Sequence, residues 1–350
     1  MNLVDLVKLG SEKKASDIHI TVGQPPTLRI DGRLVAITDT PLSPIDTIDL
    51  IHQALNESQM KVLQEKGELD FSFSSPGIAR CRVNAYRQRG SYGMALRIIP
   101  MRIPSMEELG LPKVMGDLAR LPRGLILVTG PTGSGKSTTL ASMIDQINRE
   151  RNCHILTLED PLEYLHKHNK AIVNQREIGS DSHTFGSALR GALRQDPDVI
   201  LVGEMRDLET ISIAITAAET GHLVLSTLHT LGAAKTIDRV IDVFPPHQQQ
   251  QIRVQLSSVL QAVISQQLLP RADDKGRVAA FEVMVANGAI RNLIREGKIH
   301  QIDTSIQTGG KQQMQTMDNS LINLFVRGLI RKDIALTQSV NQEEIKKYIH

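Results

Sequence analysis

The sequence predicts an α/β protein: a parallel-sheet core with a phosphate-binding loop, preceded by a small α+β domain and followed by a mostly helical region. Short, almost entirely apolar runs alternate with helix-like segments in the middle of the chain. A glycine-rich loop ending in Gly-Lys-Ser follows the first run, and the first hundred residues instead alternate short β-type runs with turns. Apolar runs that alternate with helices indicate parallel strands covered on both faces.

Residues 1–100 are expected to form the α+β domain. Two β-type runs flank Asp31-Gly32, a dipeptide typical of a tight hairpin. Apolar residues on one side predict a helix from about Pro44 to Lys66. Residues 80–86 then alternate with a period of two, which puts their polar side chains on one face, and Met94–Ile99 forms a further strand.

Residues 101–122 are expected to connect the domains, because four prolines lie between positions 100 and 122. They are Pro100, Pro104, Pro112 and Pro122. The core is expected over residues 123–270. Its four predicted strands are Leu125–Val128, Ile155–Leu158, Val199–Val202 and Leu223–Ser226. Residues 271–350 are expected to be mostly helical, and helices are predicted at Gln248–Leu269 and Asn287–Arg295.

Composition excludes several classes of protein. With 350 residues, 41% hydrophobic and 22% charged, the chain is typical of a soluble protein of two domains. No run approaches the about 18–20 apolar residues of a membrane span, and the start does not resemble a signal peptide. Two cysteines form no disulfide framework, so the cytoplasm is the expected compartment. A net charge of +2 and 3% aromatics argue against nucleic acid as a partner.

The glycine-rich loop predicts a nucleoside-triphosphate site. Its glycines let backbone N–H groups turn toward phosphate oxygens, Lys136 contributes a charge to the β- and γ-phosphates, and Ser137 a hydroxyl to Mg²⁺. The loop follows an apolar strand and opens a helix, Ser137–Arg149, whose N-terminus favours an anion. The predicted nucleotide-binding residues are Gly130, Pro131, Thr132, Gly133, Ser134, Gly135, Lys136, Ser137 and Thr138.

Strand ends predict which other residues reach the phosphates, because ligands of open parallel sheets bind at the carboxyl ends of the strands. Asp198 precedes the strand Val199–Val202 and Glu204 follows it, about 20 Å away along the chain. Glu204 is therefore the candidate that polarises the attacking water or holds magnesium through one. Gly203 stands where a metal-binding Asp is usual, so this is an atypical Walker B motif.

An acidic segment, Glu159–Glu163, follows the strand Ile155–Leu158. Its carboxylates could ligate Mg²⁺ or orient water, with Glu163 favoured as catalytic and Glu159 or Asp160 as positioning or metal-binding. The alternative is that Asp160 caps a following helix that has Pro161 at its first position.

Two histidines bracket the last predicted strand. His229 and Thr227 are expected near the phosphates, with His229 as a sensor of the γ-phosphate, and His222 at the far end. Their separation along a strand argues against a shared zinc ion.

The first domain is rich in arginine between residues 80 and 97. One interpretation is a solvated basic face or a site for acidic partners. The other is an arginine finger supplied to a neighbouring subunit, for which Arg82 and Arg97 are the candidates because strands direct their side chains.

In combination these motifs resemble the secretion-ATPase superfamily, the motors of type II secretion and type IV pili. The matching pieces are Ala15–Ile20, the Walker A loop, Glu159–Glu163, the Walker B motif with Glu204, and Thr220–His229. Within it the chain is similar to the pilus-retraction subfamily, whose signature matches the octet Ala289–Glu296. Assembly and type II secretion relatives carry a four-cysteine zinc module and a long N-terminal extension, and neither is expected here; the sequence has two cysteines.

The resemblance implies a PAS-like first domain joined to a RecA-like core in a homohexameric ring. The ring would use ATP and Mg²⁺ to retract type IV pili in twitching motility. It would dock peripherally on the cytoplasmic face of the inner membrane, contact a platform protein and act on pilin indirectly. The family also suggests Arg33 as a nucleotide contact, although it could equally be a plain turn residue. The alternatives are a pilus-assembly or type II secretion ATPase, a nucleic-acid translocase and a non-hydrolysing scaffold.

The octet itself predicts an amphipathic helix. Ile290, Leu293 and Ile294 make an apolar stripe, while Arg291 and Arg295 are expected to project together one turn apart. An ordinary surface helix would show the same pattern.

Overall fold

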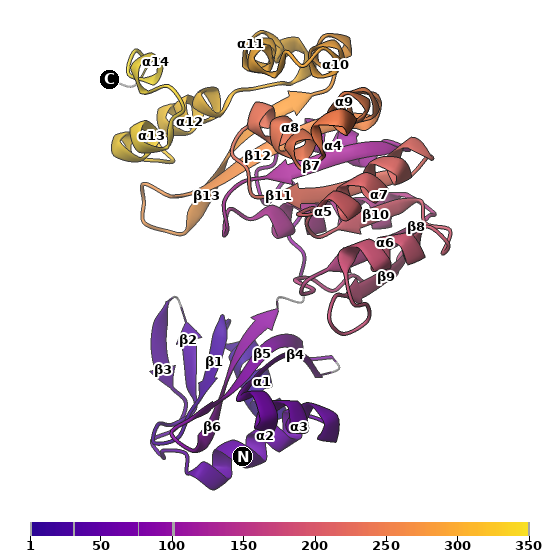
Figure 1. Cartoon of the computed structure of the whole chain (residues 1–350). Helices are drawn as coiled ribbons and strands as arrows, with labels where there is room; N and C mark the ends of the chain where they lie inside the picture. Colours follow the sequence, from indigo (N-terminus) through magenta and orange to yellow (C-terminus); the bar gives the residue numbers. More distant parts are fainter. Residues whose placement is uncertain (1, 31, 76, 100–101, 349–350) are drawn as a thin grey trace. The chain divides into compact units, whose positions relative to one another are not determined.

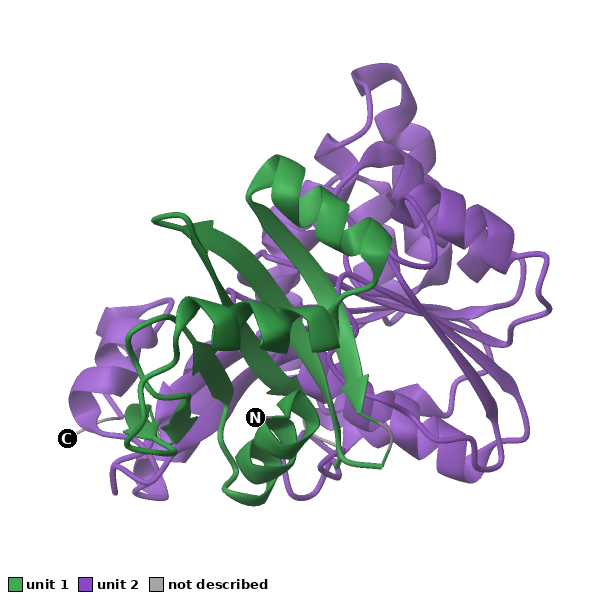
Figure 2. Ribbon diagram, turned by 90° about the horizontal axis from the view of Figure 1, so that it is seen from below, with its two compact units in different colours: residues 1–102 green, residues 103–350 purple. Residues whose placement is uncertain are grey.

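A computed structural model of the protein describes residues 2–30, 32–75, 77–99 and 102–348. The chain forms two compact units, residues 1–102 and 103–350 (Figure 2). The first is an α+β unit and the second an α/β unit with a RecA-like core, so the predicted fold class is confirmed.

The first unit is a six-stranded antiparallel sheet in the order β3-β2-β1-β6-β5-β4, packed against three helices (Figure 1). Its strands are β1 (Asp17–Ile20), β2 (Thr27–Ile30), β3 (Arg33–Ala36), β4 (Glu68–Ser75), β5 (Ala79–Gln88) and β6 (Ser91–Ile99). Its helices are α1 (Leu3–Glu12), α2 (Pro44–Ala54) and α3 (Glu57–Lys66). Alternate residues of β5 (Cys81, Val83 and Ala85) are buried in the core beneath the helices, as the period of two predicts.

Most predicted elements of this unit are present. The hairpin forms between β2 and β3, with Gly32 at φ +81°; Asp31 lies outside the described residues, as does Pro100. The prediction of a single helix to Lys66 is wrong. The first helix, α2, ends before Leu55, which has an extended backbone, and a second helix, α3, begins after its N-cap Asn56. The Asn56 side chain accepts a hydrogen bond from the Gln59 N–H and caps α3.

The second unit is built on a seven-stranded sheet in the order β13-β12-β7-β11-β10-β8-β9, parallel except for β13. Its strands are β7 (Gly124–Thr129), β8 (His154–Glu159), β9 (Ile172–Glu177), β10 (Val199–Val202), β11 (Leu223–Leu228), β12 (Leu260–Pro270) and β13 (Arg277–Val285). The four predicted parallel strands are confirmed. The sequence reading missed β9, whose polar residues do not resemble a buried strand.

Helices cover both faces of this sheet, as the apolar strands require. One core contains Leu125 and Leu127 of β7 under α6 (Phe185–Ala192), α7 (Leu208–Glu219), α8 (Ala233–Asp242) and α9 (Pro246–Val259). The other contains Ile126 and Val128 under α4 (Val114–Ala119) and α5 (Lys136–Glu150). Beyond the sheet lie α10 (Gly288–Arg295), α11 (Ile302–Thr308), α12 (Met317–Val326), α13 (Lys332–Gln338) and α14 (Gln342–Ile345) (Figure 1).

Two boundaries differ from the expectation. Residues 103–122 do not form a free connection: Met106, Met115 and Leu118 are buried in the second unit, where α4 packs on α5. The helix predicted over Gln248–Leu269 ends at Val259, and the chain continues as β12, an interior strand between β13 and β7. Its apolar residues 262–264 are buried beside β7, and this tertiary pairing overrides the helical pattern.

The predicted end of the core at residue 270 therefore falls at the turn of a hairpin, because β13 pairs with β12 along its whole length. In the part of the chain that the structure describes, no helix is both long and apolar enough to cross a membrane.

Candidate nucleotide-hydrolysis site

The glycine-rich loop lies between the end of β7 and the start of α5. Gly130 has φ +142°, and a Cβ placed there would lie 2.2 Å from the carbonyl oxygen of Gln266. No side chain is tolerated at this position, because the backbone of β12 passes directly against the loop. The glycine is therefore required by packing as well as by the turn.

Lys136 is buried at the start of α5. Its Nζ donates to the carbonyl oxygens of Gly130 (2.9 Å) and Pro131 (3.1 Å). Burial lowers the pKa of Lys136, and the nearby charges of Glu163 and Glu204 oppose that shift. The positive charge of Lys136 is thus held by two neutral carbonyls, which a phosphate can replace as its partner.

Glu204 follows β10 and faces the same cavity as the loop. Its carboxylate pairs with Arg206 Nε (2.8 Å) and lies 3.5 Å from His229 Nε2. The cavity has a volume of about 600 Å³. Its lining residues are Thr132, Glu204, Met205, Arg206, Thr227, Leu228, His229, Thr230 and Arg239. The structure thus brings together the phosphate loop, Glu204, Thr227 and His229, which the sequence had assigned to one site.

Gly203 occupies the tip of β10. Its N–H donates to the carbonyl oxygen of Leu158 (2.7 Å), and its own carbonyl accepts from Thr227 Oγ1 (2.6 Å). A Cβ at this position would lie 3.2 Å from the Leu158 oxygen. The close contact with β8 leaves little room for a side chain at this strand tip, where a metal-binding aspartate is usual.

The acidic segment begins at the end of β8. Burial raises the pKa of Glu159 to about 7, whereas Asp160 and Glu163 are exposed. No helix starts at Asp160, so the capping alternative is wrong: residues 160–171 have no regular structure. The segment is anchored instead by Leu162 N–H, which donates to Glu177 Oε2 (3.1 Å), and by a hydrogen bond between Tyr164 OH and Thr138 Oγ1 (3.0 Å).

Two residues considered in the sequence analysis, Asp198 and His222, lie at the other end of the strands, where β10 and β11 begin. Asp198 precedes β10 and accepts a hydrogen bond from the His154 N–H (2.8 Å). His222 precedes β11, and its Nδ1 lies 2.9 Å from the carbonyl oxygen of Ala217 near the end of α7. Both side chains lie at the amino ends of parallel strands, whereas the phosphate loop lies at the carboxyl end of β7.

The arginine candidates belong to the first unit. Arg82 of β5 and Arg97 of β6 are directly opposed across the sheet, and Arg97 Nε pairs with Asp17 Oδ1 at 3.1 Å. Arg33 is exposed at the start of β3. The two arginines thus lie side by side on neighbouring strands, on a face of the sheet that also carries Asp17 and Asp70.

Sequence reasoning missed several residues near the phosphate loop. Arg206 and Arg239 line the cavity, and Gln266 contacts the loop from β12. Arg206 could have been found from its position two residues after Glu204. Gln266 could not, because its segment was predicted to be helical.

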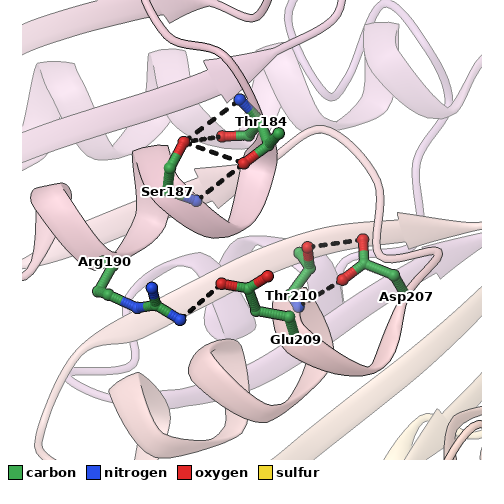
Figure 3. Close-up of polar contacts among 6 residues, drawn as sticks. All are labelled: Thr184, Ser187, Arg190, Asp207, Glu209 and Thr210. Atoms are coloured by element: carbon green, nitrogen blue, oxygen red, sulfur yellow. Dashed lines mark hydrogen bonds and ion pairs between the residues drawn. The ribbon is translucent and has the colours of Figure 1, made fainter.

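The chain beyond Arg206 is fixed where α7 begins. Asp207 caps this helix by accepting from the Thr210 N–H (2.8 Å) and hydroxyl (2.9 Å). Figure 3 shows this cap beside the ion pair of Arg190 and Glu209 (2.6 Å), which joins α6 to α7. The loop that carries Glu204 therefore runs from a central strand to a capped helix, which limits where its carboxylate can lie.

The octet helix α10 differs from expectation in one respect. Ile290 and Ile294 are buried, as the apolar stripe predicts. Arg295 is exposed, but Arg291 is half-buried and donates from Nη1 to the carbonyl oxygens of Ser257 (2.7 Å) and Ser258 (2.8 Å). The expectation that the two arginines project together is wrong, because Arg291 instead binds the end of α9.

Comparison with known proteins agrees with this geometry. The family model of type II/IV secretion system proteins matches residues 5–330. The chain is 52% identical to the type IV pilus retraction ATPase PilT of Pseudomonas aeruginosa, over 96% of this chain and 97% of the relative. It is 50% identical to a twitching motility protein of Neisseria gonorrhoeae, over 91% of this chain and 86% of the relative.

A solved structure is similar across the whole chain. The crystal structure of the pilus retraction motor PilT with bound ADP matches with a TM-score of 0.93 and 50% identity, covering 99% of each chain. The chain thus belongs to the type II/IV secretion system protein family, and within that family it is a pilus-retraction ATPase.

Proposed function

We propose that this ATPase acts as a homohexameric ring that hydrolyses Mg-ATP at the cavity beside the phosphate loop. The observation that carries the proposal is the meeting of Thr132, Glu204 and His229 around one cavity of about 600 Å³. Hydrolysis of a triphosphate needs a phosphate cradle and a group that orients the attacking water. The proposal is supported by a cavity that is lined by Thr132 of the phosphate loop and by the Glu204 carboxylate.

Each side chain has a role in this proposal. Glu204 polarises the water, and its pairing with Arg206 and His229 holds the carboxylate toward the cavity. His229 senses the γ-phosphate through Nε2. Glu163, close enough to act on the charge of Lys136, is the second carboxylate of the reaction.

Magnesium would enter together with the nucleotide. Among the described residues, no three His, Cys, Asp or Glu side chains converge as a metal cage. Mg²⁺ normally keeps several waters and binds one or two protein oxygens besides the phosphates, so such a cage is not required. Ser137, Glu159 and Asp160 fit that limited role, directly or through water; when bound, the ion neutralises charge that develops on the phosphates.

Arg82 and Arg97 are the candidates for an arginine finger that acts on a neighbouring subunit, and Arg33 for a further nucleotide contact. Arg82 and Arg97 are supported by their position side by side on neighbouring strands, and Arg33 by its exposure at the start of β3. In a ring, such residues would make each site depend on the adjacent subunit.

The trans role can be tested by mixing subunits. Glu204→Gln and Arg82→Ala proteins, each inactive alone, should regain ATPase activity when they assemble together, because some interfaces then combine an intact Glu204 with an intact Arg82. Wild type mixed with the double variant provides the reference, and light scattering gives the mass of the ring. The trans role is wrong if Arg82→Ala alone is fully active or if mixing restores nothing.

We further propose that the ring docks on the cytoplasmic face of the inner membrane through a platform protein, and so returns pilin from the pilus to the membrane. Deletion of the gene should leave cells that carry pili but do not twitch, and Glu204→Gln should fail to complement them. Loss of pili on deletion would instead favour an assembly ATPase.

A further inference from the structure

A buried amide on β12 contacts the phosphate loop. Gln266 follows Ser265, which pairs with Thr129 at the end of β7, and its side chain is 3% exposed. Its Nε2 donates to the carbonyl oxygen of Ser134 (2.6 Å), and its Oε1 accepts from Thr139 Oγ1 (2.8 Å). One side chain therefore joins the loop to the first turn of α5.

This contact determines the direction of a peptide group in the loop. In a trans peptide the C=O and the following N–H point in opposite directions. With its oxygen directed at Gln266, the Ser134 carbonyl requires the N–H of Gly135 to point away from β12. A phosphate loop binds anions through N–H groups that all turn inward, so an outward carbonyl at Ser134 is part of the binding geometry.

The opposite face of β12 contacts the segment that follows His229. Neighbouring residues of a strand point to opposite faces, and Ser265 Oγ accepts from the N–H of Gly232 (3.0 Å), three residues after His229. Glu282 of β13 accepts from the next N–H, that of Ala233 (2.7 Å). The β12–β13 hairpin thus contacts both the phosphate loop and the segment that follows His229.

We propose that Gln266 is a positioning residue of the ATPase: by binding the Ser134 carbonyl, it keeps the N–H groups of the loop turned toward the phosphates. The residue touches no phosphate itself, so its effect should appear first in nucleotide affinity. The proposal rests on the ATPase activity and not on the ring or the arginine finger.

The first test compares two buried amides of similar bonding. Gln266→Met removes both hydrogen bonds and keeps the length of the side chain. Asn148→Leu is the matched control, because Asn148 is also 3% exposed and makes two hydrogen bonds, with Lys167 and Asn169, near the other end of α5. Both changes should lower the melting temperature by similar amounts.

Nucleotide affinity separates the two variants. The Kd for fluorescent ADP, measured with the full chain, should rise at least tenfold in Gln266→Met and stay within twofold of wild type in Asn148→Leu. The KM for ATP should rise more than kcat falls, because the reacting groups are intact. Wild-type affinity in Gln266→Met, together with a lowered melting temperature, would show that Gln266 only packs.

A third variant gives a readout that packing alone would not produce. In Gln266→Glu, a neutral carboxyl can still donate to the Ser134 oxygen and accept from Thr139, whereas an ionised one repels that oxygen. Burial raises the pKa of such a carboxyl, in documented cases to about 8–9. ADP affinity relative to wild type at the same pH should therefore be close to normal at pH 6 and weaken as the pH rises to 9.

If Gln266→Glu binds ADP with the same affinity as wild type at every pH from 6 to 9, the proposal is overturned. If Gln266→Met does not fold, Thr139→Val offers a milder change, since it removes only the hydroxyl that holds Gln266 Oε1. Thr139→Val should raise the Kd for ADP by a smaller factor than the loss of both hydrogen bonds would. A wild-type Kd in Thr139→Val, together with a wild-type Kd in Gln266→Glu at pH 9, would refute the positioning role.

Discussion

Arg291 provides the sharpest test of how α10 is attached to the motor. Its guanidinium donates to Ser257 and Ser258 carbonyl oxygens and, through Nη2, to Gln261 Oε1 (3.1 Å). The two carbonyls belong to the last turn of α9, where a helix has no partners of its own for them and where a positive charge is favoured. Arg295, one turn further along α10, is exposed to solvent.

The expected magnitude follows from these contacts. A hydrogen bond to a charged group contributes about 1.5–3 kcal/mol, and carbonyls at a helix end regain part of this from water. Arg291→Met keeps the aliphatic stem and should lower the free energy of unfolding by about 2–4 kcal/mol. For a unit of this size that is about 5–15 °C in Tm. Arg295→Met should change it by no more than about 0.5 kcal/mol.

Thermal unfolding of the two variants, with ATPase rates at a temperature where both are folded, checks the argument. Equal and small changes in Tm for the two variants would refute the anchoring role of Arg291. Retraction lost in Arg295→Met, with stability and ATPase rate unchanged, would assign the exposed arginine to a contact outside the motor. The double substitution would not separate these effects.

Three further predictions follow from the site and the core. Glu204→Gln should bind ADP normally but hydrolyse ATP at least about 100-fold more slowly, whereas Lys136→Ala should lose binding and turnover; phosphate release and ADP titration distinguish them. Gly130→Ala should lower stability by about 3 kcal/mol or more in denaturant unfolding, because its Cβ meets the Gln266 carbonyl at 2.2 Å. Burial lowers the pKa of His166 to about 4, so as the pH falls the unfolded chain binds a proton at this histidine before the folded chain does. The free energy of unfolding should therefore drop between about pH 6.5 and 4, by up to about 3 kcal/mol, and His166→Leu should abolish this part of its pH dependence.

Much of the site was predictable because it depends on local sequence and on one rule of sheet topology. The phosphate loop is a contiguous segment, and the strand before it is recognisable by its apolar residues. In a parallel sheet all carboxyl ends meet at one edge, so Glu204 and His229 could be placed there and Asp198 at the other edge. The structure has this arrangement.

The sequence misled where a segment's pattern was ambiguous. Residues 260–269 follow a helical stretch and have a pattern that continues it, but in the structure they form a strand that pairs with β7 and β13. That pairing is non-local, so no window of sequence around the segment contains it. The same error concealed Gln266 and moved the expected end of the core.

The sequence by itself determined the class of chemistry: glycines, Lys136 and Ser137 in one loop, and carboxylates at strand ends, give a triphosphate site whatever lies around them. Only the tertiary structure decided what supports that site. Gln266 meets Ser134 across 132 positions of sequence, and Arg291 meets Ser257 across 34. Contacts of this kind depend on which strands become neighbours, and that is decided by burial of the whole sheet and not by any local pattern.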